Sequence, residues 1–401
     1  MQKAVFLFVI LLGLASCTSD AEPTDTTSSD DVSDQVEPTE DIISFPEDAK
    51  YNELALFLAA ETGSPEGLFN GFESENIWTK YKTSIDNLWK KTNEKVPTMR
   101  SWSTEQLSDM QTEGGTLFYP FSGPDFLHAD IFFPNYDTIV MIGLEPIGTY
   151  PAMDLKMQDT LGQQYLNGIY KSMNAILGLS FFRTIAMADD FKGEVDGTLP
   201  VLMHFMVRTG HEVMYQERVG VLPSGELTTN FSLTDDSTYV GNRFYYRKKG
   251  EENVRVLNYF AVNLQDTPYT SRGGLEAKGL ETRTDFVNYL NGLNIRATYI
   301  KSASYLLHYS SFSIVRDIIL DESEFILQDD SGVLLKDFDP EVWDLTFYGT
   351  YTKPINLFSQ RMQNDLKQHY DSTGIDVQDL PFGIGYQYRN GTSNLLRATK
   401  K

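Results

Sequence analysis

Cysteine is nearly absent from this chain of 401 residues, which contains Cys17 and no other. The remainder of the chain therefore offers no disulfide, no zinc-cysteine cluster and no cysteine nucleophile. A folded region without such links has to be stabilised by its hydrophobic core, and the roughly 350 residues available are enough to form one.

Positive charge is also scarce. The chain has 33 Lys and Arg residues against 56 Asp and Glu residues, which gives a formal net charge of −23. Beyond residue 48 there remain 45 acidic and 32 basic residues, so the folded region is acidic in its own right. Such a charge argues against nucleic acid and anionic lipid surfaces as partners.

Long apolar runs are missing except at the N-terminus. Residues 4–15 are apolar but too short to span a bilayer, Lys3 precedes them, and Leu14-Ala15-Ser16-Cys17 follows directly. This is the pattern of a secretory signal with cysteine at the cleavage point, and it resembles the lipobox of bacterial lipoproteins. The resemblance covers this segment alone. An ordinary signal peptide with an incidental cysteine is the alternative.

The lipobox resemblance implies a removed signal peptide, residues 1–16, and a lipid on Cys17, palmitate included. It also implies attachment to the bacterial cell envelope, for which we expect the outer membrane, on its periplasmic or its surface face. Residues 18–48 hold eleven acidic residues and no Lys or Arg. We therefore expect residues 17–43 to be a disordered acidic tether. Residues 44–401 should form one large globular domain or two intertwined ones.

Helical spacing of apolar residues predicts several amphipathic helices. Ser44 and Glu47 have the spacing of a capping box at a helix start, and Pro354 is placed to open a last long helix. The predicted helices lie within residues 44–63, 77–89, 161–177, 181–190, 199–207, 284–290, 305–319 and 354–374.

Short runs rich in Val, Tyr and Phe predict strands, and turn residues between them indicate antiparallel hairpins at 223–225, 249–251 and 329–332. We therefore expect an α+β fold, in which an antiparallel β-meander packs against amphipathic helices. The predicted strands are residues 116–121, 137–144, 212–222, 226–233, 243–248, 254–264, 295–300, 324–328 and 333–338.

The segment "TLFYPFSGPDFLHADIFFPN", residues 116–135, carries the main candidate site. Ser122 and Asp125 have capping-box spacing, which predicts a short helix between two strands. Pro residues at 120 and 124 exclude a nucleophile elbow around Ser122, since that motif needs glycines there. Asp125, His128 and Asp130 could form a general base or part of a metal site. A capped helix with a polar face is the alternative.

Other candidate metal ligands are His204, His211, Asp329 and Asp330. His204 lies in "LPVLMHFMV", which also fits a buried helix with one hydrogen-bonded histidine, and Gly210 separates it from His211. Asp329 and Asp330 lack the spacing of a calcium loop and are typical of a turn. We expect no cofactor.

Aromatic residues are abundant, with 22 Tyr, 25 Phe and 4 Trp. They suit contacts with a glycan, a peptide or another envelope protein, although a large core also uses them. The sequence therefore favours a secreted, lipid-anchored envelope protein with a non-catalytic binding or structural role. The alternatives are a hydrolase using Asp125, His128 and Asp130, with or without metal, and an accessory subunit of an envelope complex.

Overall fold

The computed structural model describes residues 45–401 except 70, 73–74, 150–159, 180–196, 235–238, 271–275, 373–375 and 389–390. Residues Phe45–Lys401 form one compact unit. The signal peptide, Cys17, the tether and the helix predicted at 181–190 lie outside the described residues. None of the helices that the structure describes is both long and apolar enough to cross a membrane.

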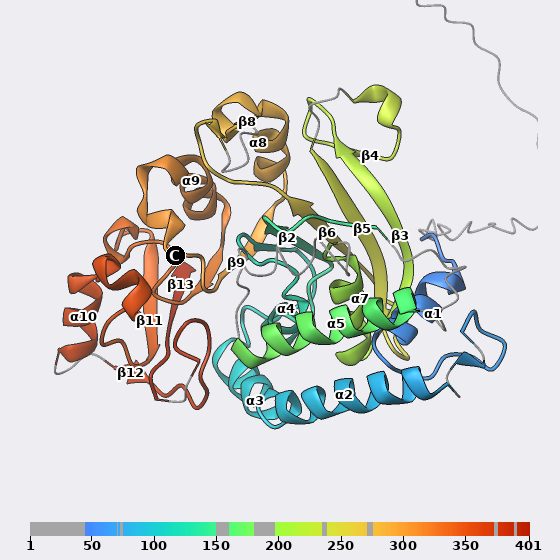
Figure 1. The fold of residues 1–401 in the computed structure, drawn as a ribbon. Coiled ribbons are helices and arrows are strands. Elements are labelled where there is room, and N and C mark those ends of the chain that lie inside the picture. The colour runs from blue at the N-terminus through green and yellow to red at the C-terminus, as the bar shows by residue number, and fades with distance from the viewer. Residues whose placement is uncertain are drawn as a thin grey trace, which may run out of the picture. The chain divides into compact units, whose positions relative to one another are not determined.

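Eleven strands form one mixed sheet in the order β12-β11-β13-β10-β9-β1-β2-β6-β5-β3-β4 (Figure 1). The five central strands, β10, β9, β1, β2 and β6, are parallel to one another, whereas β10 pairs with β13 and β6 pairs with β5 in antiparallel fashion. The strands are β1 Thr116–Tyr119, β2 Thr138–Gly143, β3 His211–Val221, β4 Leu227–Thr228, β5 Val240–Lys248, β6 Val254–Ala261, β9 Ile295–Ile300, β10 Phe325–Gln328, β11 Trp343–Gly349, β12 Val377–Gln378 and β13 Asn394–Lys400. Strands β7 Tyr269–Thr270 and β8 Glu276–Ala277 pair separately.

Helices cover both faces of the sheet, and each face has its own hydrophobic core. Helices α1 to α5 and α7 pack on the first face, where α2 and α5 lie side by side, and α8, α9 and α10 pack on the second (Figure 1). The helices are α1 Ala49–Leu58, α2 Asn76–Asn93, α3 Val96–Gln106, α4 Phe126–Phe132, α5 Thr160–Leu179, α7 Leu199–Arg208, α8 Thr284–Asn291, α9 Ser313–Glu322 and α10 Asn364–Asp371.

The α+β class is confirmed, but the purely antiparallel meander is wrong. Antiparallel pairing holds for β3 to β6, where the predicted turns at 223–225 and 249–251 join β3 to β4 and β5 to β6. The centre is parallel instead. In β1, Leu117 and Tyr119 point into the first core and Phe118 into the second. A strand buried on both faces is typical of a parallel centre.

Strands β1 and β9 are neighbours in the sheet, and the strands that follow them in sequence lie on opposite sides of the pair. The crossover β1-α4-β2 runs over the first face, and β9-α9-β10 runs over the second, with β2 and β10 on opposite sides of the pair. This arrangement is a topological switch point, where the loops at the carboxyl ends of neighbouring strands diverge and leave a crevice.

Four local predictions are corrected by the structure. Asp48, not Ser44, caps α1, since its side chain accepts from the Lys50 N–H at 3.1 Å. Residues 333–338 form no strand, because β10 pairs with β9 and β13 and the turn at 329–332 closes no hairpin. The long helix after Pro354 is instead a 3-10 segment, Asn356–Arg361, followed by the short α10. Residues 305–319 hold two 3-10 turns before α9.

Candidate functional site

Four buried polar side chains meet where β1 and β9 end, and we call Tyr119, Asp125, His128 and Lys301 the strand-end cluster. The Lys301 ammonium lies 2.5 Å from Asp125 Oδ2, and the Tyr119 hydroxyl donates to the same oxygen at 2.8 Å. His128 Nδ1 lies 2.8 Å from Asp125 Oδ1. Each side chain is at most 7% exposed as a residue, so water screens these charges little.

Asp125 is the centre of this cluster, and it also begins α4. Its Oδ1 accepts from the backbone N–H of His128 at 3.3 Å, which makes Asp125 the helix cap. Ser122, predicted to cap this helix, instead donates to the carbonyl of Ile142 at 3.3 Å. The predicted cap is therefore wrong: the short helix is present, but the residue that caps it is Asp125, three positions after Ser122.

Charge keeps Asp125 ionised despite its burial. Burial alone would raise the pKa of this carboxyl, but His128 and Lys301 together lower it well below its usual range. Burial lowers the pKa of His128, an effect that Asp125 opposes and Lys301 adds to. The imidazole is therefore neutral at pH 7. Its Nδ1 lies 2.8 Å from Asp125 Oδ1 and 3.0 Å from the Lys301 ammonium. A proton on Nδ1 pairs with the carboxylate and leaves Nε2 as an acceptor, whereas a proton on Nε2 lets Nδ1 accept from Lys301 and makes Nε2 a donor.

A cavity of about 600 Å³ adjoins the cluster on the first face of the sheet, and we call it the helical-layer cavity. Asp125, His128 and Lys301 form part of its wall. Seven further lining residues are apolar and come from helices α2, α3, α4, α5 and α7: Leu88, Val96, Met99, Leu127, Ile131, Leu177 and Phe205. Its exposed rim carries Lys91, Glu94 and Lys95, with Thr92 and Asn174 beside them.

A second, smaller cavity of about 80 Å³ lies in the crevice at the switch point. Loops after β1, β2, β6 and β9 line it, and Lys301 belongs to both cavities. Phe121, Ser302, Ser304 and Tyr305, in the loops after β1 and β9, have φ between +52° and +60°. Non-glycine residues adopt this conformation at a cost of about 1–3 kcal/mol each, and they cluster at functional sites.

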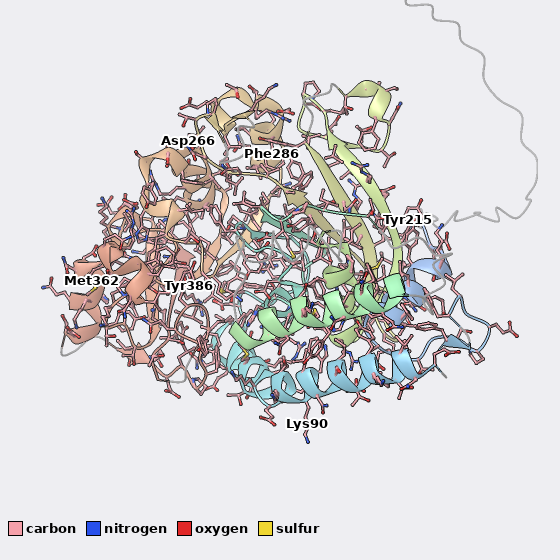
Figure 2. The ribbon with its side chains drawn as sticks, in the orientation of Figure 1. Lys90, Tyr215, Asp266, Phe286, Met362 and Tyr386 are labelled. Carbon is pink, nitrogen blue, oxygen red and sulfur yellow. The ribbon has the colours of Figure 1, made fainter. Side chains whose placement is uncertain are left out.

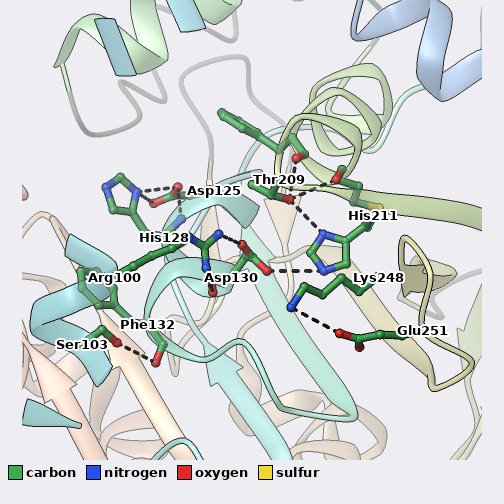
Figure 3. A network of polar contacts seen from close by, with 12 residues as sticks. Arg100, Ser103, Asp125, His128, Asp130, Phe132, Thr209, His211, Lys248 and Glu251 are labelled. Carbon is green, nitrogen blue, oxygen red and sulfur yellow. Dashed lines mark hydrogen bonds and ion pairs between the residues drawn. The ribbon is translucent and has the colours of Figure 1, made fainter. Parts of the chain in front are cut away.

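Asp130 does not join Asp125 and His128. Figure 3 shows it between Arg100 and His211, away from the ring of His128. Arg100 pairs with its carboxylate, and His211 Nε2 lies 3.4 Å from Oδ1. The predicted group of three is thus divided, because Asp125 and His128 share one turn of α4 and Asp130 faces other elements.

His204 and His211 have different surroundings. His204 Nε2 accepts from the Trp89 indole N–H at 2.7 Å, and Nδ1 lies 3.0 Å from the carbonyl of Leu58. Burial lowers its pKa to about 3, so it stays neutral with both nitrogens engaged. His211 instead contacts Thr209 at 3.0 Å and Asp130. No shared site forms between the two histidines.

Asp329 and Asp330 follow β10 and are both buried. Asp329 accepts from the N–H groups of Ser302 at 2.9 Å and Ser331 at 3.0 Å. Asp330 accepts from the Tyr305 hydroxyl at 2.5 Å. Burial, with the charge of Asp329, raises the pKa of Asp330 to about 7. This pair therefore fixes the loop after β9 against the loop after β10.

Within the described residues, no group of three or more His, Cys, Asp and Glu side chains is arranged to hold a metal ion. The structure adds two residues that the sequence did not single out, Tyr119 and Lys301. The signal for Lys301 was a lysine directly after the predicted strand 295–300. Comparison with known protein families, with curated proteins and with solved structures found no match.

Proposed function

We propose that the protein is a lipid-anchored protein of the bacterial cell envelope that binds a small, largely apolar molecule without converting it. The lipobox resemblance at residues 14–17 supports the anchor. One observation supports the binding: apolar side chains line the helical-layer cavity, and they lead to the buried Asp125, His128 and Lys301. Ligand sites commonly have about 300–1,000 Å³ of space, apolar walls and a few placed polar groups.

The charge balance within the strand-end cluster favours binding over chemistry. Asp125 and Lys301 pair with each other, so neither needs a charged ligand to be stable in its buried position. The neutral imidazole of His128 presents Nε2, which accepts from or donates to a hydroxyl or amide of the ligand according to its tautomer. These groups therefore orient a molecule whose affinity comes from its apolar body.

The neutral dye N-phenyl-1-naphthylamine tests this proposal. The purified protein lacking residues 1–17 should bind about one dye per chain by titration calorimetry. Leu127→Trp, which places a larger side chain in the cavity, should weaken binding at least about tenfold, and Ile131→Phe provides a second filling variant. Leu357→Trp is the control, because Leu357 is 73% exposed and lies outside the lining. Equal dye binding by all folded variants would refute the proposal.

Ester hydrolysis is the second candidate, and the Asp125–His128 contact favours it. In the tautomer that carries its proton on Nδ1, towards Asp125, Nε2 is a base that can take a proton from water. His128 also lines a cavity that could hold an acyl chain. Asp130 has no part in this version of the mechanism.

Hydrolysis makes a separate prediction with p-nitrophenyl butyrate. Turnover above the buffer rate should be lost in His128→Gln and kept in His211→Gln, because His211 contacts Asp130 rather than the cluster. Dye binding without any turnover in the wild-type protein would leave binding as the function.

A further inference from the structure

The rim of the helical-layer cavity is basic in a chain that is acidic as a whole. Between residues 76 and 95 there are five lysines and two acidic residues, Asp86 and Glu94. Two of these lysines, Lys91 and Lys95, line the cavity at its exposed rim together with Glu94. Lys82, in contrast, is paired with Asp86 at 3.0 Å.

The interior offers no further positive charge to a ligand. Lys301 is paired with Asp125, and His128 is held neutral. Within the described residues, neither Lys91 nor Lys95 makes an ion pair, and Glu94 is the carboxylate that lines the rim beside them. These two lysines are therefore available to attract an anionic group of a ligand. Lys95 also acts electrostatically on His128, so rim and interior are close enough for one molecule to span them.

We infer that the cavity takes a single-chain amphiphile with an anionic head group, its chain along the apolar lining and its head at Lys91 and Lys95. This inference rests on the proposed function and names the ligand class of that same site. An apolar chain gains free energy by leaving water for Leu127, Ile131 and Phe205. A head group that stays at the rim keeps most of its hydration while it gains the attraction of two cations.

Competition against the bound dye tests the inference with two molecules of equal chain length. Dodecanoate and dodecanol, both below the concentrations at which they aggregate, should each displace N-phenyl-1-naphthylamine. Dodecanoate should bind about threefold or more tightly, as expected for partly exposed charges. Added salt should reduce that difference, because it screens the anion and leaves dodecanol unaffected.

Lysine variants assign the effect to the rim. Lys95→Met and Lys91→Met keep an apolar stem and remove the charge, so each should weaken dodecanoate binding and leave dodecanol binding unchanged. Lys90→Met is the matched control, because Lys90 is the neighbour of Lys91 on α2 but points outward, away from the cavity (Figure 2).

The outcomes separate this inference from the proposed function. If the dye binds but dodecanol competes as well as dodecanoate, or if Lys90→Met has the same effect as Lys95→Met, the inference is wrong and the proposed function stands. If neither dye nor dodecanoate binds in direct calorimetry, both are wrong. A charge preference that is lost in the rim variants alone supports both.

Discussion

At the scale of residues, the buried pair of Asp125 and Lys301 sets the charge of the strand-end cluster. Removing one partner leaves an uncompensated charge inside the protein, which costs about 3–5 kcal/mol. We expect Asp125→Asn and Lys301→Met each to lower the free energy of unfolding by about that amount. The double variant should recover much of the loss. Urea unfolding of the four proteins measures this, and additive losses would show that the two side chains do not depend on each other.

Asp330 gives the protein a distinct pH dependence. Its pKa is raised to about 7 by burial and by Asp329, whereas an unfolded aspartate releases its proton near pH 4. Between about pH 4 and pH 7 the folded state therefore holds a proton on Asp330 that the unfolded state has lost. The contribution of Asp330 to the free energy of unfolding is greatest below about pH 4 and declines as the pH rises towards 7. Asp330→Asn should flatten the unfolding free energy over this range. An unchanged pH profile would contradict the raised pKa.

Some contacts of the site could be predicted from the sequence and others could not. Asp125 and His128 are three positions apart on one helix, so spacing alone predicted their contact. Asp130 is close in sequence but faces Arg100 and His211, which lie on other elements. Lys301 is separated from Asp125 by 176 positions. This contact forms because β1 and β9 are neighbours in the sheet, and no local sequence pattern predicts that they are.

At the scale of elements, the hairpins were predictable and the parallel centre was not. Turn residues between β3 and β4 and between β5 and β6 mark antiparallel pairs within a few residues. Strands β1, β9 and β10 were also expected near their positions, but their order depends on crossovers over both faces of the sheet. Helix α3 was missed because its segment, "VPTMRSWSTEQ", has few apolar positions to reveal a helical period.

Two glycine turns provide a matched test of how the β3–β4 hairpin is held. Gly225 and Gly250 both have φ near +90°, so alanine is strained at either position. A Cβ at Gly225 would also lie 2.6 Å from the backbone of Asn288 on α8, whereas nothing lies within 4 Å at Gly250. Gly225→Ala should therefore cost about 1–3 kcal/mol more than Gly250→Ala in urea unfolding. Equal losses would mean that the turn does not pack against α8.

At the scale of the whole molecule, the proposed lipid anchor and the proposed amphiphile ligand agree with each other, because amphiphiles concentrate at membranes. If Cys17 carries the lipid, Cys17→Ala should abolish labelling by a palmitate analogue in cells and leave the precursor uncleaved or released from the membrane fraction. Labelling that persists in the variant would exclude Cys17 as the acceptor. The folded region should melt at the same temperature with and without the anchor.

A small apolar molecule should occupy the helical-layer cavity, and a crystal structure of the protein soaked with 1-bromonaphthalene tests this. The anomalous scattering of bromine locates the ligand independently of how the electron density of the protein is interpreted. We expect one strong bromine peak among Leu127, Ile131 and Phe205, and its loss in crystals of Leu127→Trp. Bromine peaks confined to the protein surface, with the cavity filled by ordered water, would contradict it.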